Sequence, residues 1–416
     1  MSSRIAITIQ NYVQYYSVKP FLDLKKYSLD IYVPDIDINN LGFKPMYDDI
    51  YNFLAEKKYN VYRKPKKNIK YQILLEPSPM DYYFKFNYKY RIKYKYTAIS
   101  AKPGITYNIY PNMIYDAVLC YSTYEEEILN NFTKTFLVGR LCFKDFKKQT
   151  NYNNKKTILY LPTYGEYSCL DDTLNALEKI SDKYFIITKE HHGTNYLYTE
   201  DERSKKLKKV ISQFYDSSYP LAKLLEISDV VLTDNSGSIF ESFYTRVPVC
   251  IFSKSIKKCN FNNLESLQYQ LVKDDVIPFT DNSNKVEETI NKALSKDYIK
   301  KQAHISDILF PIKQKDSLKS FTNAIDYFLN DEDKLLKNRI ILHREIINYV
   351  KSLLETNDEL ENNYNSINRI LNDVQSENIT LKNELANFKK QKLYRISSKL
   401  RSIISKARRN KWYEKI

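Results

Sequence analysis

Short apolar runs alternate with longer amphipathic stretches over the first 140 residues of the chain. The short runs have the length and the β-branched or aromatic content of strands, and the longer stretches have the spacing of helices. Strands are expected at 4–9, 29–34, 71–75, 94–100, 117–122 and 135–138, and helices at 14–27, 46–59 and 125–132. Strands separated by helices predict a parallel, doubly wound sheet.

The same alternation returns after a polar stretch at 144–156 that is rich in lysine and asparagine. Strands are expected at 157–161, 184–188, 230–232 and 248–252, and helices at 172–180, 221–227 and from Ile239 onward. The fold class is therefore α/β, with two doubly wound, Rossmann-like domains. Two such domains with a cleft between them form the glycosyltransferase-B architecture.

Three strands of the second half end in polar or glycine-containing loops, at 162–166, 189–193 and 233–238. Because the carboxyl ends of parallel strands share one edge of a sheet, these loops predict a ligand crevice. In the third loop, Ser236 or Ser238 is expected to cap the following helix. Backbone N–H groups and the helix dipole would then favour an anion such as a phosphate. An N-capped helix in any α/β domain is the alternative.

Beyond residue 330 the apolar positions follow a strict repeat of 3.5 residues. The d positions are Ile346, Leu353, Leu360, Ile367, Val374, Leu381 and Phe388, and the a positions are Val350, Asn357, Tyr364, Leu371, Asn378 and Leu385. Six heptads predict a coiled coil, and asparagine at two a positions favours a parallel homodimer. A single long helix packed on the enzyme is the alternative.

The last 28 residues, 389–416, contain eleven lysines and arginines and one acid, Glu414, in a chain of net charge +15. Apolar residues from Leu393 to Ala407 share one helical face, and Trp412 follows. This composition predicts an amphipathic helix that lies on an anionic membrane surface. Binding to nucleic acid by charge is the competing interpretation, and the apolar face argues against it.

These patterns divide the chain of 416 residues into four expected parts. They are domains at 1–145 and 146–330, the coiled coil at 331–388 and the basic tail at 389–416. The five cysteines are scattered and lack ligand spacing, so reduced thiols are expected, with no metal site and no cofactor. No leader or membrane-spanning run is visible. The cation and aromatic alternation at 84–96 is interpreted as a solvated strand face, not as a nucleic-acid site.

Four segments of the chain resemble the CDP-glycerol glycerophosphotransferases of wall-teichoic-acid and capsule synthesis. They are FLVGR at 136–140, ILYLPTYGE at 158–166, IITKEHH at 186–192 and YPLAKLLEISDVVLTDNSGSIFESF at 219–243. The resemblance implies transfer of glycerol phosphate, or of a similar polyol phosphate, from a CDP-activated donor to a hydroxyl of a lipid-linked or polymer acceptor, with release of CMP. It also implies a peripheral position at the cytoplasmic face of the membrane.

The resemblance implies roles for particular residues. His191 is expected to contact the phosphoryl group, and Glu241 is expected to face solvent and bind the ribose hydroxyls. The expected substrate-binding residues are Lys102, Gly104, Thr163, Gly165, Lys189, His192, Asp234, Asn235, Ser236, Gly237, Ser238 and Glu241.

One departure from the family concerns the general base. The family carries a first-domain histidine, whereas the first 190 residues here contain none. Glu166, Asp116 or His191 could serve instead. Three functions stay open: the polyol-phosphate transferase, a glycosyltransferase-B sugar transferase or UDP-sugar 2-epimerase-like enzyme, and a degenerate nucleotide-binding scaffold.

Overall fold

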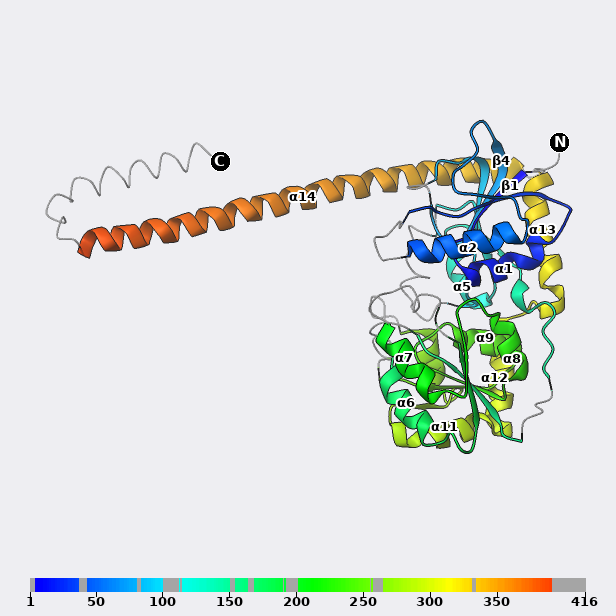
Figure 1. The fold of residues 1–416 in the computed structure, drawn as a ribbon. Helices are drawn as coiled ribbons and strands as arrows, with labels where there is room; N and C mark the ends of the chain where they lie inside the picture. Colours follow the sequence, from blue (N-terminus) through cyan, green and yellow to red (C-terminus); the bar gives the residue numbers. More distant parts are fainter. Residues whose placement is uncertain are drawn as a thin grey trace. The chain divides into compact units, whose positions relative to one another are not determined.

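The computed structural model describes residues 4–36, 43–80, 84–99, 112, 114–149, 154–163, 168–189, 191, 201–254, 256, 265–330 and 334–390. The chain divides into two units, Met1–His343 and Arg344–Ile416. The first unit contains two α/β domains, each built on a parallel sheet (Figure 1).

The first domain has a seven-stranded parallel sheet in the order β3-β2-β1-β4-β5-β6-β7. Its strands are β1 Arg4–Thr8, β2 Ser28–Tyr32, β3 Val61–Tyr62, β4 Lys70–Glu76, β5 Asn87–Tyr94, β6 Ala117–Cys120 and β7 Lys134–Leu137. The helices between them are α1 Tyr12–Leu22, α2 Lys44–Glu56 and α5 Thr123–Leu129. Apart from β3 and the position of β5, these elements confirm the sequence prediction.

Helix α1 begins and ends for local reasons. The side chain of Asn11 accepts a hydrogen bond from the Gln14 N–H at 3.0 Å, which satisfies a free donor of the first turn. The helix ends at Leu22, two residues after Pro20, whereas the sequence predicted a helix to residue 27. The N–H of the C-cap residue Asp23 bonds back to the carbonyl of Lys19 and closes the last turn.

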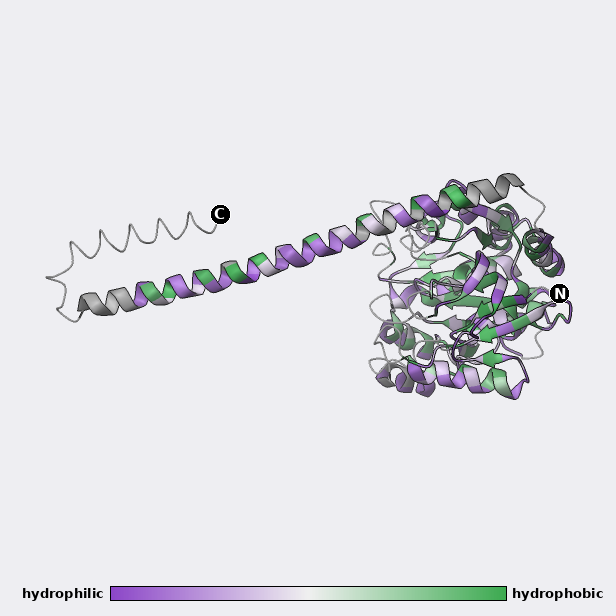
Figure 2. Ribbon diagram, turned by 90° about the horizontal axis from the view of Figure 1, so that it is seen from above, coloured by the Kyte–Doolittle hydropathy of each residue, from purple (hydrophilic) through white to green (hydrophobic). Residues whose placement is uncertain are grey.

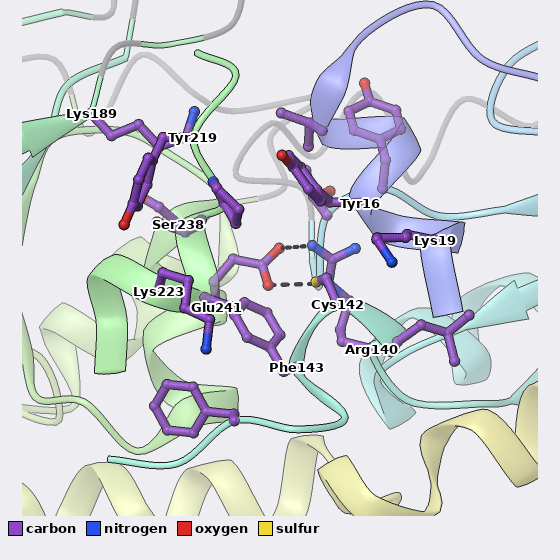
Figure 3. Close-up of a pocket in the computed structure, with 18 of the residues that line it drawn as sticks. Tyr16, Lys19, Arg140, Cys142, Phe143, Lys189, Tyr219, Lys223, Ser238 and Glu241 are labelled. Atoms are coloured by element: carbon purple, nitrogen blue, oxygen red, sulfur yellow. Dashed lines mark hydrogen bonds and ion pairs between the residues drawn. The ribbon is translucent and has the colours of Figure 1, made fainter. Parts of the chain in front are cut away.

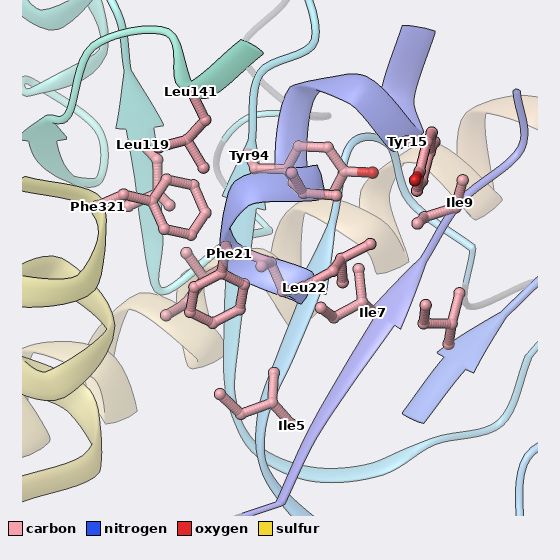
Figure 4. Close-up of a cluster of buried hydrophobic side chains, with 14 of the residues drawn as sticks. Ile5, Ile7, Ile9, Tyr15, Phe21, Leu22, Tyr94, Leu119, Leu141 and Phe321 are labelled. Atoms are coloured by element: carbon pink, nitrogen blue, oxygen red, sulfur yellow. The ribbon is translucent and has the colours of Figure 1, made fainter. Parts of the chain in front are cut away.

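The larger core of this domain lies between the sheet and three helices (Figure 4). Ile5 and Ile7 of β1 and Ile9 directly after it alternate along the chain and point to the face that α1 covers. Phe321 of the much later helix α13, Ser317–Asn330, packs on Phe21 with ring centroids 5.0 Å apart. By packing, α13 belongs to the first domain, whereas the sequence boundaries assigned 146–330 to the second.

The second domain has a six-stranded parallel sheet in the order β10-β9-β8-β11-β12-β13. Its strands are β8 Thr157–Leu161, β9 Phe185–Lys189, β10 Gln213–Tyr215, β11 Val230–Thr233, β12 Val249–Phe252 and β13 Phe279–Thr280. Its helices are α6 Leu170–Glu178, α7 Asp201–Val210, α8 Leu221–Ile227, α9 Ser238–Thr245, α10 Leu267–Lys273, α11 Val286–Ala293 and α12 Lys296–Leu309. Separate cores on the two faces of the sheet confirm a doubly wound domain.

Short 3₁₀ helices join these elements at Leu141–Phe143 (η1), Ser283–Lys285 (η5) and Gln314–Asp316 (η6). The chain leaves the first domain through Gly139, which has a φ of 70°. A Cβ atom at this position would lie 2.9 Å from the Ile312 side chain and 3.0 Å from the Tyr244 hydroxyl. Glycine is therefore required where the chain crosses between the domains.

The interpretation of 84–96 as a solvated strand face is wrong. The strand runs from Asn87 to Tyr94, and Arg91, Lys93 and Lys95 are all buried. Each has a polar partner: Arg91 Nε donates to Glu76 at 2.6 Å, Lys93 to Asn112 at 2.7 Å and Lys95 to Glu125 at 3.1 Å. The alternation predicted a strand correctly. The polar partners that allow these basic side chains to be buried come from distant parts of the chain.

Lys93 differs from its two neighbours because its side-chain partner is neutral. Burial, followed by repulsion from Lys95, lowers the pKa of Lys93 to about 7, although Glu125, Cys120 and Glu76 oppose the change. About half of the Lys93 amines are therefore without their proton near pH 7 in the folded protein.

The last described element is the helix α14, Lys334–Lys390, which has 57 residues. Hydrophobic and hydrophilic residues alternate along it (Figure 2). None of the described helices is long and apolar enough to cross a membrane. The expected basic helix at 389–416 lies outside the described residues except for its first two positions.

We expect Lys93→Met to remove a pH dependence of stability. Unfolded lysine keeps its proton to a pH of about 10.4, whereas the folded residue loses it near 7, so the unfolded chain binds more protons between these values. Wild-type stability should therefore gain up to about 1.4 kcal/mol per pH unit from this group as the pH rises from 7 to 9. Denaturant unfolding followed by circular dichroism at pH 7, 8 and 9 measures the difference between the two proteins.

The matched control is Lys85→Met, which removes an exposed lysine from the same segment and should keep the wild-type slope. Equal slopes in wild type and Lys93→Met would show that Lys93 keeps its proton in the folded state.

Candidate functional site

A cavity of about 510 Å³ lies between the two domains. The first domain contributes one side of α1 and the residues that follow β5 and β7. The second domain contributes the carboxyl ends of β8, β9 and β11 and the start of α8 (Figure 3). The loops that the sequence predicted to share one edge of the sheet therefore do meet, and the first domain faces them.

Six of the predicted site residues line this cavity: Lys189, His191, Ser236, Gly237, Ser238 and Glu241. Thr163 is buried directly after the lining residue Pro162. The predicted residues Lys102, Gly104, Gly165, Glu166 and His192 lie outside the described residues.

Asp234 and Asn235 do not line the cavity, although they belong to the same loop. Asp234 is fully buried and accepts hydrogen bonds from the N–H groups of Thr163 at 2.9 Å and Cys169 at 3.4 Å. Asn235 accepts a bond from the Gln268 side chain at 2.9 Å. Asp234 therefore holds the loops after β8 and β11 together, and Asn235 holds the second of these loops to α10.

The hydroxyl groups of Thr233, Ser236 and Ser238 form a small cluster at the start of α9. Ser238 Oγ lies 3.0 Å from Ser236 Oγ and 3.2 Å from Thr233 Oγ1. Ser236 Oγ also accepts a bond from the Ser238 N–H at 3.3 Å. The helix begins at Ser238 with Gly237 as its N-cap, so the predicted serine N-cap is wrong. Ser236 still satisfies a first-turn donor.

Gly237 allows the domains to approach each other. A Cβ atom there would lie 3.1 Å from the carbonyl oxygen of Ile99, in the segment after β5 of the first domain. The sequence predicted Gly237 as a substrate-binding residue. The structure shows that the other domain already lies against it.

Glu241 forms a buried ion pair with Arg140 across the domain boundary. Arg140 Nη2 lies 2.8 Å from Glu241 Oε1, and Arg140 Nε lies 3.1 Å from Oε2 (Figure 3). The backbone N–H of Ala98 also donates to Oε1, at 3.0 Å. Glu241 is 3% exposed, so the expectation that it faces solvent is wrong. Burial raises the pKa of its carboxyl, and the Arg140 guanidinium opposes this rise.

This arrangement limits what Glu241 can bind. Oε1 accepts two hydrogen bonds and Oε2 accepts one, so a single acceptor position remains on Oε2. Arg140 is held in turn, since Nη1 donates to Ser17 on α1 at 3.1 Å and its N–H donates to Tyr244 on α9 at 3.1 Å. Glu241 can therefore accept one further hydrogen bond while Arg140 holds it.

Several lysines surround the cavity. Lys189 is 8% exposed and donates to the Ser217 carbonyl at 2.9 Å. Lys19 pairs with Asp23, and Lys223 pairs with Glu226 at 2.9 Å. Four acids, Asp23, Asp145, Glu226 and Glu241, line the same cavity as five basic residues, so the lining carries a small excess of positive charge.

Sequence reasoning missed part of the lining. Arg140 and the segment from Tyr219 to Lys223 lie in stretches that resembled the family, so a signal was available there. Nothing in the sequence marks Tyr16 and Lys19 as cavity residues, because only the fold determines which face of α1 borders the cavity. Asp116, one candidate for the base, lies at the amino end of β6, where its carboxylate accepts the Arg91 N–H at 2.7 Å, and it does not line the cavity.

Within the described ranges no group of three or more histidine, cysteine, aspartate or glutamate side chains is arranged to hold a metal ion.

Comparison with solved structures supports the fold. A putative UDP-N-acetylglucosamine 2-epimerase from Listeria monocytogenes is 13% identical with a TM-score of 0.50, over 80% of this chain and 98% of that one. The S. aureus MnaA–UDP complex is 12% identical with a TM-score of 0.50, over 79% and 97%. The wall teichoic acid polymerase TagF is 16% identical with a TM-score of 0.48, over 81% and 90%.

At these identities the likeness concerns the fold, which is a two-domain glycosyltransferase-B-like arrangement of two parallel sheets. No protein-family profile and no curated protein sequence matches the chain.

We expect Arg140→Met to destabilise the protein by about 3–5 kcal/mol, because it leaves the Glu241 carboxylate buried without its counter-ion. Combining it with Glu241→Gln should recover a large part of that loss, since both charges are then removed. A double-mutant cycle measured by denaturant unfolding gives the coupling. Lys183→Met, which breaks the exposed Lys183–Glu287 pair, should change stability little and is the control. Additive effects of the two substitutions would contradict the coupling.

Proposed function

We propose that this protein is a glycosyltransferase-B-type transferase that uses a CDP-activated polyol phosphate. It moves glycerol phosphate, or a similar polyol phosphate, to a hydroxyl of a lipid-linked or cell-surface polymer acceptor and releases CMP. The supporting observation is the interdomain cavity of about 510 Å³, in which the hydroxyl loop before α9 lies with Lys189 and His191. The family-like sequence motifs give the donor class.

The cavity has the size and chemistry for a nucleotide diphosphate. Its volume falls in the range of cavities that enclose a small-molecule ligand, roughly 300–1,000 Å³. The hydroxyls of Ser236 and Ser238 would donate to the pyrophosphate, and the nearby lysine ammonium groups would offset its charge. The aromatic rings of Tyr16 and Tyr219 line the same cavity and offer apolar contact to the base and the sugar.

The chemistry is a displacement at phosphorus. The oxygen of the acceptor hydroxyl forms a bond to the phosphorus that carries the glycerol, and the bond from this phosphorus to the bridging oxygen breaks. CMP leaves with that oxygen and its negative charge, while the hydroxyl proton passes to a base. His191 lies in the cavity and would act as this base or stabilise the phosphoryl oxygens.

Binding of the donor's ribose would involve both members of the ion pair. Glu241 has one acceptor position left while Arg140 holds it, so one ribose hydroxyl could bond there. Binding at both oxygens would require Arg140 to release the carboxylate. Donor affinity and domain separation would then be linked.

A UDP-sugar transferase or 2-epimerase-like enzyme is the second candidate. The observation that favours it is the fold, since one structure with a TM-score of 0.50 is named a putative UDP-N-acetylglucosamine 2-epimerase and another with the same score is a complex with UDP. A nucleotide-binding scaffold without turnover is the third, because the first 190 residues contain no histidine.

We also propose that residues 389–416 attach the enzyme to an anionic membrane surface. Eleven lysines and arginines against one acid supply the attraction, and the apolar residues between them supply contact with the lipid. Such attachment would keep the enzyme at the surface that carries a lipid-linked acceptor.

We expect CDP-glycerol or CDP-ribitol to raise the melting temperature more than UDP-N-acetylglucosamine does, with CMP in between. Ser236→Ala should weaken binding of the preferred nucleotide about tenfold, the effect of losing one hydrogen bond to a charged group. Calorimetric titration measures the change. Ser242→Ala removes a hydroxyl from the same helix outside the cavity and should bind normally. A preference for the UDP-sugar would favour the second candidate.

We expect His191→Ala to reduce turnover of the preferred donor about 100-fold or more, with donor affinity changed only a few-fold. Single-turnover release of CMP in the presence of a lipid acceptor measures it. His304→Ala, an exposed histidine on α12, is the matched control. Wild-type rates in His191→Ala would remove this residue from the mechanism, and no turnover by the wild type with any donor would favour the scaffold.

We expect removal of residues 389–416 to release the protein from anionic vesicles. Each basic residue near such a surface contributes about 1 kcal/mol, so even a strongly screened set gives stable attachment. Flotation at low and high salt measures it, and wild-type binding should fall steeply with salt. Equal binding to neutral vesicles would mean that apolar contact dominates.

A further inference from the structure

Helix α14 has an exposed apolar stripe. Its d positions Ile346, Leu353, Leu360, Ile367, Val374 and Leu381 range from 40% to 63% exposed. They recur every seven residues over five consecutive intervals.

An exposed apolar stripe of this length indicates a partner surface that packs on it. A helix of 57 residues is about 85 Å long, and helices of this kind depend mainly on packing of an apolar face for their stability. A strict repeat of seven residues also limits what the partner can be. It matches the seam of a left-handed coiled coil, in which another helix with the same repeat supplies the complementary surface.

We propose that a second copy of this chain covers the stripe, as a parallel and in-register two-stranded coiled coil that includes residues 346–381. The proposal does not depend on the proposed enzymatic function.

The two asparagines at a positions determine the orientation. In a parallel, in-register pair Asn357 faces the partner's Asn357, and Asn378 faces the partner's Asn378, so each amide meets an amide. In an antiparallel pair aligned over the same heptads, Asn357 would lie opposite Val374 and Asn378 opposite Leu353. Each amide would then be buried against an aliphatic side chain, which is unfavourable.

The charged residues beside the stripe agree with this orientation. In the parallel pair Glu377, at a g position, lies across from the partner's Lys382 at the following e position. No pair of like charges arises between g and e positions over 346–382. Residues 345–382 also contain seven acids and three bases, so an anionic membrane would repel this part of the helix.

A parallel arrangement has a consequence for the tail. Residues 389–416 of both copies follow the same end of the coiled coil, so two basic segments would reach one surface together. Attachment through two linked segments is stronger than through one, because the second contact becomes intramolecular.

The oligomeric state of the full-length chain tests the proposal, measured by size-exclusion chromatography with light scattering. The wild type should have the mass of a dimer. Leu360→Asp should raise the dissociation constant about 100-fold or more, because it buries a carboxylate in the seam. Ile379→Asp is the matched control, since Ile379 is exposed but lies off the stripe at a b position, and it should stay dimeric. Circular dichroism checks that both variants keep their helix.

Orientation is tested by disulfide trapping. Asn378→Cys should give a covalent dimer by itself under mild oxidation, with wild type as the control for the native thiols. Formation of the covalent dimer only when Asn378→Cys is mixed with Leu353→Cys would show an antiparallel pair. That result, a monomeric wild type, a trimer, or a dimer that Leu360→Asp leaves unchanged would each overturn the proposal.

Discussion

The ion pair between Arg140 and Glu241 is the interaction on which the candidate site depends. Two opposite charges buried at a domain boundary lose hydration, and they are tolerated because they bond to each other and to further polar groups. Arg140 reaches Glu241 with two nitrogens and Ser17 with a third, and Glu241 also accepts the Ala98 N–H. The pair therefore fixes α1, the segment after β5 and helix α9 relative to one another. It forms part of the wall of the cavity that would hold the nucleotide.

The first domain also buries charged side chains, along β5, and the charge state of each depends on its partner. Arg91 and Lys95 are buried against carboxylates, whereas Lys93 is buried against an amide. The first two can stay charged, and the third has its pKa lowered to about 7. A highly basic chain thus carries part of its positive charge inside the fold, where neighbours decide whether a given amine is ionised.

One loop at the carboxyl end of β11 combines two kinds of residue. Asp234 and Asn235 are buried and hold neighbouring loops, while Ser236 and Ser238 line the cavity. The different roles of these residues, which lie within five consecutive positions, follow from the geometry of a parallel sheet. The first residues after a strand are still enclosed by adjacent strands, and the next ones reach the crevice.

The order of elements, both parallel sheets and the loops that form the site could be predicted from the sequence, because hydrophobic spacing and polar strand ends are local properties. The heptad pattern of α14 was equally visible in the sequence, and the pairing of this helix stays a prediction. The sequence could not tell that α13 returns to the first domain, that Arg91, Lys93 and Lys95 are buried, or that Glu241 is covered by Arg140. Each of these depends on which distant groups meet, and only the tertiary structure brings residue 140 to residue 241. A charged side chain is recognised as buried only when its partner is known, because the free energy of burying the charge depends on that partner.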